Sequence, residues 1–95
     1  MADSKIPAYN PFVYHGTLGS GDDLNNIKGR DKVGMYSITS NVSNAPSGGN
    51  WSILLSFVFG SGQQIVITHN AIMARAYTGS PLAWTAWKRI LFSEY

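Results

Sequence analysis

The chain has 95 residues and a formal net charge of +2 at pH 7; 44% of its residues are hydrophobic, 13% aromatic and only 13% charged. A chain of this length forms one domain at most and buries a little over ~60% of its unfolded surface. It is too hydrophobic for intrinsic disorder, and its few charges are too scattered for strong nucleic-acid binding. Because it has no cysteine, disulfides and thiolate metal sites are excluded.

Charge is absent from a long continuous stretch of the chain, which runs from Val33 to Ala74. An ordinary soluble domain is roughly 25% charged, so a lone small monomer would expose an unusually neutral surface. We therefore expect self-association. The N-terminus lacks a signal-peptide pattern, and the longest apolar stretch, residues 53–59, is too short to span a bilayer. We expect synthesis in a cytoplasm and no membrane insertion.

Residues 1–20 predict an extended N-terminal arm, followed by a β domain over residues 21–95. Two prolines in the arm, Pro7 and Pro11, remove backbone donors and disfavour helix. The arm is too apolar for a solvated tail, because it also carries Tyr9, Phe12 and Tyr14. Two roles remain open at this point: the arm folds back onto its own domain, or these three side chains dock on another subunit or a larger assembly.

The segment Asp22–Lys28 predicts one short helix. Either Asp22 or Asp23 can accept the free N–H groups of a first turn, and both carboxylates favour the positive end of the helix dipole. Leu24 and Ile27 are three residues apart and therefore share a face. We expect about two helical turns here.

Five segments after this helix predict β-strands joined by short connections: residues 33–39, 51–59, 63–69, 72–78 and 82–92. The second alternates, with Trp51, Ile53, Leu55, Phe57 and Phe59 on one side and Ser52, Leu54, Ser56 and Val58 on the other. Because this other side is only half polar, we expect the strand to be central and covered on both faces. The predicted fold is mainly β: a small antiparallel meander of about five strands, with the short helix and the extended arm on its N-terminal side.

Groups for catalysis are scarce. The acids number five, and capping explains the adjacent pair Asp22 and Asp23 better than acid–base chemistry does. The only histidines, His15 and His69, have no metal-ligand spacing, so a surface or hydrogen-bonded role is favoured. One histidine per chain on the axis of a trimer is the alternative. We expect no enzymatic activity, no cofactor and no metal.

Large rings are abundant for a chain of this size, and include Trp51, Trp84 and Trp87. For any one ring, core packing is the commoner role. Aromatic faces beside amides and hydroxyls are also what saccharide recognition uses. Binding residues lie in loops more often than in strands, so the candidates for saccharide contact are Asn41, Asn44, Asn50, His69 and Asn70. Their alternative role is to form solvated turns.

Several motifs occur together in the chain: Asp23-Leu-Asn25, Gly34-Met-Tyr36, a Gly-rich loop with Pro46 before Trp51-Ser-Ile-Leu-Leu55, Gln63 or Gln64, Arg75, and the ending Trp84-Thr-Ala-Trp87-Lys-Arg89-Ile90. In this combination the chain resembles the knob domain of pyocin-type and tailed-bacteriophage tail fibre proteins. The resemblance covers about residues 22–91, and the ending is its most specific part.

The resemblance implies a receptor-binding homotrimer in the virion tail or fibre, assembled in the host cytoplasm and used for host attachment. Its implied partners are its own copies, other virion proteins bound through the arm, and bacterial surface glycan. Trp84 and Trp87 then resemble core or inter-subunit packing residues, and Arg75 a buried or interface donor. We place Trp51 and Arg89 in the same structural group. The alternative is a structural virion decoration or connector without a host ligand.

Overall fold

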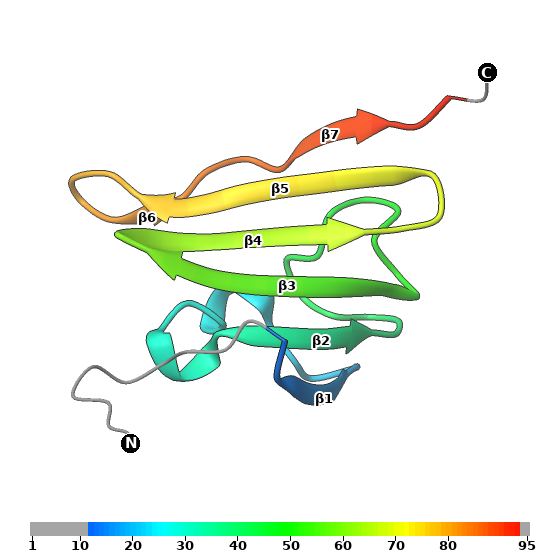
Figure 1. Cartoon of the computed structure of the whole chain (residues 1–95), viewed down its shortest axis with the longest axis horizontal. Helices are drawn as coiled ribbons and strands as arrows, with labels where there is room; N and C mark the ends of the chain where they lie inside the picture. Colours follow the sequence, from blue (N-terminus) through cyan, green and yellow to red (C-terminus); the bar gives the residue numbers. More distant parts are fainter. Residues whose placement is uncertain (1–11, 94–95) are drawn as a thin grey trace.

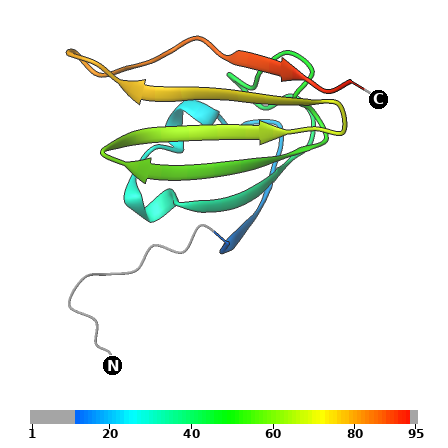
Figure 2. The ribbon, with the colours of Figure 1, turned by 45° about the horizontal axis from the view of Figure 1, so that its top comes forward.

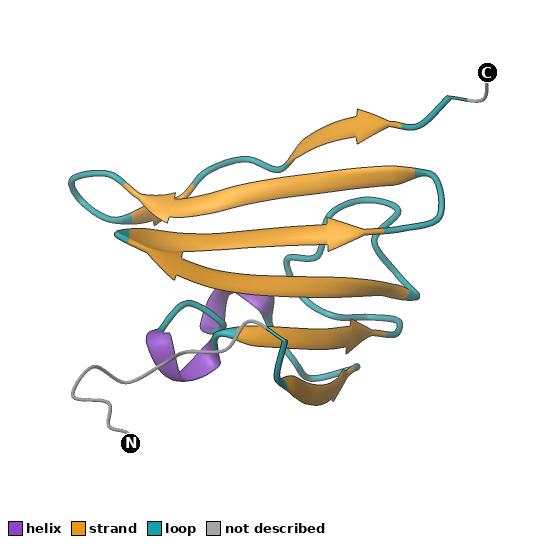
Figure 3. Ribbon diagram, viewed as in Figure 1, coloured by secondary structure: helices purple, strands orange, loops and turns teal. Residues whose placement is uncertain are grey.

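The computed structural model describes residues 12–93, which form one mixed seven-stranded β-sheet (Figures 1 and 3). Its strands are β1 (Tyr14–Leu18), β2 (Gly34–Ile38), β3 (Ser52–Phe59), β4 (Ser61–Ile67), β5 (Ala71–Thr78), β6 (Ala83–Trp84) and β7 (Lys88–Leu91). They lie in the order β1-β2-β3-β4-β5-β6, and β7 also pairs with β5. The predicted mainly-β class is confirmed.

Strands β2 to β5 follow one another through the sheet as antiparallel neighbours. They overlap the four segments for which alternation and turn residues predicted strands, but β4 begins at Ser61, two residues before its predicted start, and β5 at Ala71, one residue before. The predicted fifth strand over residues 82–92 is wrong as one element, because it forms two short strands, β6 and β7, that pair with different parts of β5. The Trp84–Trp87 motif spans the break between them, where the two indoles turn toward the sheet core.

The sheet is not purely antiparallel, because β1 pairs with β2 in parallel. Gly34 permits this pairing: its φ is +142°, and an added Cβ would lie 2.6 Å from the ring of His15. That ring donates a 2.6 Å hydrogen bond through Nε2 to the Val33 carbonyl and stacks on Tyr36. The end of the predicted arm is therefore a strand of the sheet, while residues 1–11 lie outside the described part of the chain.

The predicted helix over residues 22–28 is wrong, since only one 3-10 turn, η1 (Leu24–Asn26), forms there; a second turn, η2 (Arg30–Lys32), follows. Asp23 does cap η1, accepting a 2.8 Å bond from the Asn25 backbone N–H. Distant parts of the chain hold both ends of this turn: the Leu24 N–H, which a helix would leave free, bonds to the Ser43 carbonyl at 3.0 Å, and Gln64 Nε2 donates to the carbonyls of Leu24 and Ile27. The turn ends at Ile27, which leaves the helical conformation with φ −102° and ψ 83°.

The hydrophobic core lies on one face of the sheet. It consists of Leu24 and Ile27 beside η1, Val42 in the β2–β3 loop, and Tyr36, Ile38, Leu54, Val66 and Met73 from the strands. In Figures 1 and 2 the cyan turn η1 lies behind β3 and β4. The sheet therefore has a covered face and an open face within the described chain.

The burial of β3 reverses the simplest expectation from its sequence. Its half-polar side is the buried one, with Ser52, Leu54 and Ser56 at 8%, 0% and 1% exposure. Its apolar side faces outward, and Ile53 is 49% exposed. The strand is central, as predicted, but covering on both faces is wrong for residues 12–93. Ser56 shares a row with Gln64 and Arg75, and the Gln64 amide finds its partners beneath the sheet, in Leu24, Ile27 and Arg75 Nε. The Ser56 hydroxyl and Arg75 Nη2 are buried without a hydrogen-bond partner within the described chain.

Candidate functional site

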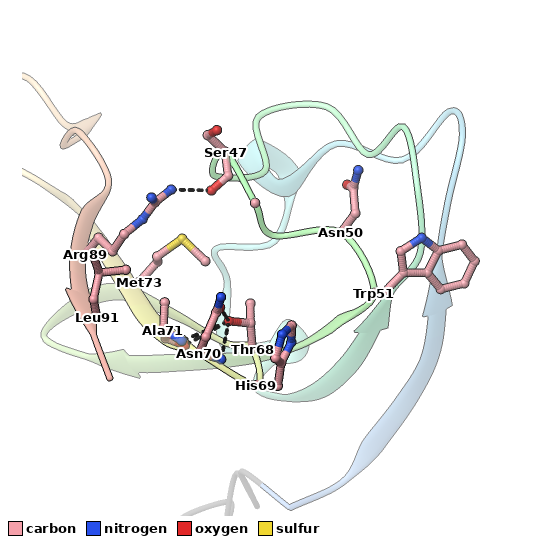
Figure 4. A pocket seen from close by; sticks show the side chains of 11 residues that line it. Ser47, Asn50, Trp51, Thr68, His69, Asn70, Ala71, Met73, Arg89 and Leu91 are labelled. Carbon is pink, nitrogen blue, oxygen red and sulfur yellow. Dashed lines mark hydrogen bonds between the residues drawn. The ribbon is translucent and has the colours of Figure 1, made fainter. Parts of the chain in front are cut away.

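A surface pocket of about 360 Å³ lies at one end of the sheet, where the β2–β3 loop, the β4–β5 turn and β7 meet (Figure 4). Its lining comprises Ser47, Gly48, Asn50, Trp51, Thr68, His69, Asn70, Ala71, Met73, Arg89 and Leu91. Loops that meet at the end of a rigid sheet commonly carry binding residues. The pocket is therefore the first candidate for a binding site.

The β4–β5 turn supplies the lower wall of this pocket in Figure 4. Thr68 Oγ1 accepts a 3.0 Å bond from the Ala71 N–H and donates one of 2.9 Å to Asn70 Oδ1. The Asn70 carbonyl accepts a 2.9 Å bond from the Phe92 N–H, which ties the turn to the chain after β7. The turn is thus held from within and presents the exposed side chains of His69 and Asn70 to solvent.

Arg89 on β7 forms the opposite wall, and its guanidinium donates through Nη2 to the carbonyl of Ser47. It is the one formally charged side chain among the residues that line the pocket, which include no carboxylate. The remaining polar groups are neutral amides, hydroxyls and an imidazole. Such a lining suits a ligand rich in hydroxyls, with or without a negative charge.

Trp51 stands at the rim of the pocket, and in Figure 4 its ring points away from Arg89 and Met73. The side chain is 74% exposed and its φ is +60°, a left-handed conformation that an L-residue enters at a cost of about 1–2 kcal/mol. Its N–H bonds to the Thr39 carbonyl at 3.2 Å. A large ring held exposed in a strained backbone is the kind of outlier that concentrates at functional sites.

The five predicted loop residues divide into two groups. Asn50, His69 and Asn70 come together in the pocket. Asn41 and Asn44 do not line it, and both adopt φ of +63° in the β2–β3 loop. Asn44 is a structural residue, since its Nδ2 donates to Asp23 Oδ1 at 2.8 Å and its carbonyl accepts from the indole of Trp87 at 3.0 Å.

The closing tryptophans form a separate cluster beneath the sheet, around Arg75. The Arg75 guanidinium lies 4.0 Å from the ring centroid of Trp84 and 4.7 Å from that of Trp87. Its Nε donates to Oε1 of Gln64 at 2.9 Å. Burial lowers the pKa of Arg75 to about 10, against the opposite effect of the Asp23 carboxylate. This cluster is formed within a single chain, and Trp87 packs against the hydrophobic core.

Trp51 and Arg89 were grouped with that cluster in the sequence, but both are exposed and line the pocket. Sequence reasoning missed this, because a Trp in alternation with Ile53 and Leu55 resembles a core residue. The available signal was its position directly after Gly48-Gly-Asn50, a run suited to left-handed backbone. Among the proposed arm residues, Phe12 is 75% and Tyr14 56% exposed, and Tyr9 lies outside the described residues.

Residues 12–93 contain neither a metal-binding cluster nor a membrane-spanning helix. The described residues contain no group of three His, Asp or Glu side chains that could hold a metal ion. His15 and His69 lie on β1 and in the β4–β5 turn respectively. No helix in the same part of the chain is long and apolar enough to cross a membrane.

Comparison with known proteins gives no match: no family model, no curated protein and no solved structure is recognisably similar to this chain. The resemblance to tail fibre knob domains therefore stays a prediction that rests on the short motifs in the sequence. The case for a function depends on the geometry of the pocket and of the sheet.

Proposed function

We propose that the chain is a bacteriophage fibre or tail-tip protein that assembles as a homotrimer and takes part in adsorption to bacterial surface polysaccharide. One observation carries this proposal: the loop-end pocket combines Asn50, His69 and Asn70 with the exposed, strained ring of Trp51. Function belongs to a site rather than to a fold, and this site has the chemistry of saccharide recognition.

The chemistry follows from the groups present. Sugar hydroxyls both donate and accept hydrogen bonds, and the amides of Asn50 and Asn70 offer both functions within one pocket. The apolar face of a pyranose ring packs on an aromatic side chain, and Trp51 at the rim offers one to a sugar unit that extends beyond the pocket. A volume of about 360 Å³ falls at the lower end of the range for small-ligand pockets, ~300–1,000 Å³. Binding of one or two sugar residues per site is weak, and several copies acting together strengthen it.

An array of purified bacterial capsular polysaccharides and lipopolysaccharides tests this directly, with the full chain as the probe. We expect retention on a subset of them, reduced at least tenfold for Asn50→Ala combined with Asn70→Ala. Asn41→Ala is the matched control, because it removes an exposed amide of the same loop outside the pocket. The absence of retention on every polysaccharide, or equal retention by the pocket variant, contradicts the receptor role.

The second candidate is a structural virion component without a host ligand. The exposed rings of Phe12 and Tyr14 favour it, because they lie where the chain enters the sheet and offer apolar area for docking. Removing residues 2–12 takes away Tyr9 and Phe12 but keeps β1 and the Val13 carbonyl, which accepts a 2.7 Å bond from the Met35 N–H. If this candidate is correct, the shortened protein folds but is not incorporated into phage particles. Incorporation at the level of the full chain would exclude it.

A further inference from the structure

The open face of the sheet carries a continuous row of isoleucines. In the cross-strand register Ser37 pairs with Ile53, Ile53 with Ile67, Ile67 with Ile72, and Ile72 with Ile90. Directly paired residues project on the same face of a sheet, so four isoleucines from β3, β4, β5 and β7 stand side by side. The next row has the same character: Met35, Leu55, Ile65, Ala74 and Lys88.

These rows are accessible in the single chain. Ile53 is 49%, Ile67 38% and Ile90 68% exposed. The two rows hold one charged residue, Lys88, at the margin formed by β7. The covered face, by contrast, contains buried Gln64 and Arg75. The sheet thus presents its more apolar side to the outside, and large contiguous apolar patches on soluble proteins mark interaction sites.

We infer that this open face is the surface on which copies of the chain pack against one another. The proposed homotrimer requires a contact between copies, and the open face would supply it. This contact does not depend on saccharide binding. A second copy is the occupant whose chemistry matches: each face is neutral and rich in branched aliphatic side chains, and Lys88 at one edge is the single charge to be kept at the rim. An anionic partner would find no matching cationic patch on these two rows.

The area is consistent with such a contact. The two rows span five strands, and a third row, Phe57, Gln63 and Ala76, spans three. With strands ~4.8 Å apart and rows ~6.8 Å apart, these positions cover roughly 420 Å². Two such faces together contribute ~850 Å², somewhat below the ~1,000 Å² that a specific interface needs. One face-to-face pair is therefore near the lower limit of stability, and closure of a symmetric ring, in which each copy contacts two others, adds to it. Association is expected to depend on protein concentration.

Light scattering on the full chain, over a range of concentrations, tests the inference. We expect a mass that corresponds to two or more chains of 10.3 kDa each. Ile53→Thr with Ile67→Thr keeps β-branched side chains on the strands but removes apolar area, and Ile67→Lys places a charge in the centre of the row. Both changes shift the mass toward one chain at concentrations where the unaltered protein associates. Leu82→Lys is the matched control, because Leu82 is 60% exposed outside the strands and should leave association unchanged.

Circular dichroism establishes that the variants retain the sheet, and the threonine pair keeps the test valid if Ile67→Lys does not fold. A mass of one chain for the unaltered protein at every concentration overturns the inference. A second result would also overturn it: an apolar dye that binds more strongly only once residues 2–11 are removed. That increase would mean that the protein's own arm covers the face in the intact chain. The polysaccharide array separates the two proposals: an associating protein that binds no polysaccharide refutes the receptor role alone.

Discussion

Arg75 and Gln64 lie directly opposite each other on β5 and β4, and Nε of the guanidinium donates a 2.9 Å hydrogen bond to the amide Oε1. The same amide donates through Nε2 to the carbonyls of Leu24, at 2.7 Å, and Ile27, at 2.9 Å. Gln64 is fully buried and Arg75 is 7% exposed. One side chain thus binds both the end of η1 and Nε of the buried cation, whose Nη2 has no hydrogen-bond partner within the described chain, and it fixes which face of the sheet points inward.

Replacement of Gln64 by alanine should therefore destabilise the protein strongly. The change leaves the Ile27 carbonyl and the Arg75 Nε without the Gln64 amide, while the Leu24 carbonyl still accepts from the Ile27 N–H. A buried group left without its partner costs ~1–3 kcal/mol, and more when it is charged. Gln63→Ala is the matched control, since Gln63 lies on the other face and bonds only to Ser61, at 3.0 Å, within the described chain. It should cost less than ~1 kcal/mol. Urea unfolding at one fixed protein concentration measures both values; equal losses would contradict this role of Gln64.

Trp51→Asn should stabilise the fold and weaken polysaccharide binding. Asparagine adopts the left-handed conformation more readily than tryptophan, as Asn41 and Asn44 do in the same loop. Because the Trp51 ring is 74% exposed, little buried area is lost, and the free energy of unfolding should rise by ~0.5–1 kcal/mol. Trp51→Ala removes the ring but keeps the strain, so it should lose binding without this gain. A loss of stability in the asparagine variant would show that the ring supports the fold.

Gly34→Ala should detach β1 from the sheet. The new Cβ would meet the carbonyl oxygen of Val13 and lie 2.6 Å from the His15 ring, in addition to the strain at φ +142°. Gly16→Ala shares the unfavourable positive φ, +114°, but meets no atom within 4 Å. Gly34→Ala should cost roughly 1–3 kcal/mol more than this control. Amide exchange of Met35, whose N–H bonds to Val13, should become faster in Gly34→Ala alone.

The stability of the fold should fall in acid partly because of Asp23. Hydrogen bonds from the Asn44 amide and then the Asn25 N–H hold the pKa of its carboxyl below the usual value. A lowered pKa means that the folded state favours the charged form. The resulting stability is present above the unfolded pKa, about 3.9, and is lost as the pH falls through the lower folded value. Urea unfolding between pH 5 and pH 2 should show a weaker pH dependence for Asp23→Asn than for the unaltered protein, and an unchanged dependence would contradict this role of Asp23.

The strands were predictable from the sequence because alternation and turn residues are local signals. The short helix was not, since the Asp22–Lys28 segment favours a helix locally, whereas contacts with Ser43 and Gln64, both distant in sequence, hold it as a single 3-10 turn. The parallel pairing of β1 was equally out of reach, because it depends on the close approach that Gly34 allows. Neither contact leaves a pattern in its own stretch of sequence.

The candidate site was predictable only in part. Asn50, His69 and Asn70 could be selected because turn residues often line binding loops, but the same argument selected Asn41 and Asn44, which form the loop itself. The exposure of Trp51 and of Ile53 depends on which side of β3 faces inward. Alternation identifies the two sides but does not choose between them, and the polar partners of Gln64, distant in sequence, make the choice.

Iodide quenching of tryptophan fluorescence, with and without bacterial polysaccharide, tests the receptor role most directly. Trp51 is exposed, whereas Trp84 and Trp87 are partly buried against Arg75, so iodide acts mainly on Trp51. We predict that a polysaccharide retained on the array protects the unaltered protein from iodide, and that Trp51→Ala shows no such change. A retained polysaccharide that leaves quenching of the unaltered protein unchanged would contradict binding at the loop end of the sheet.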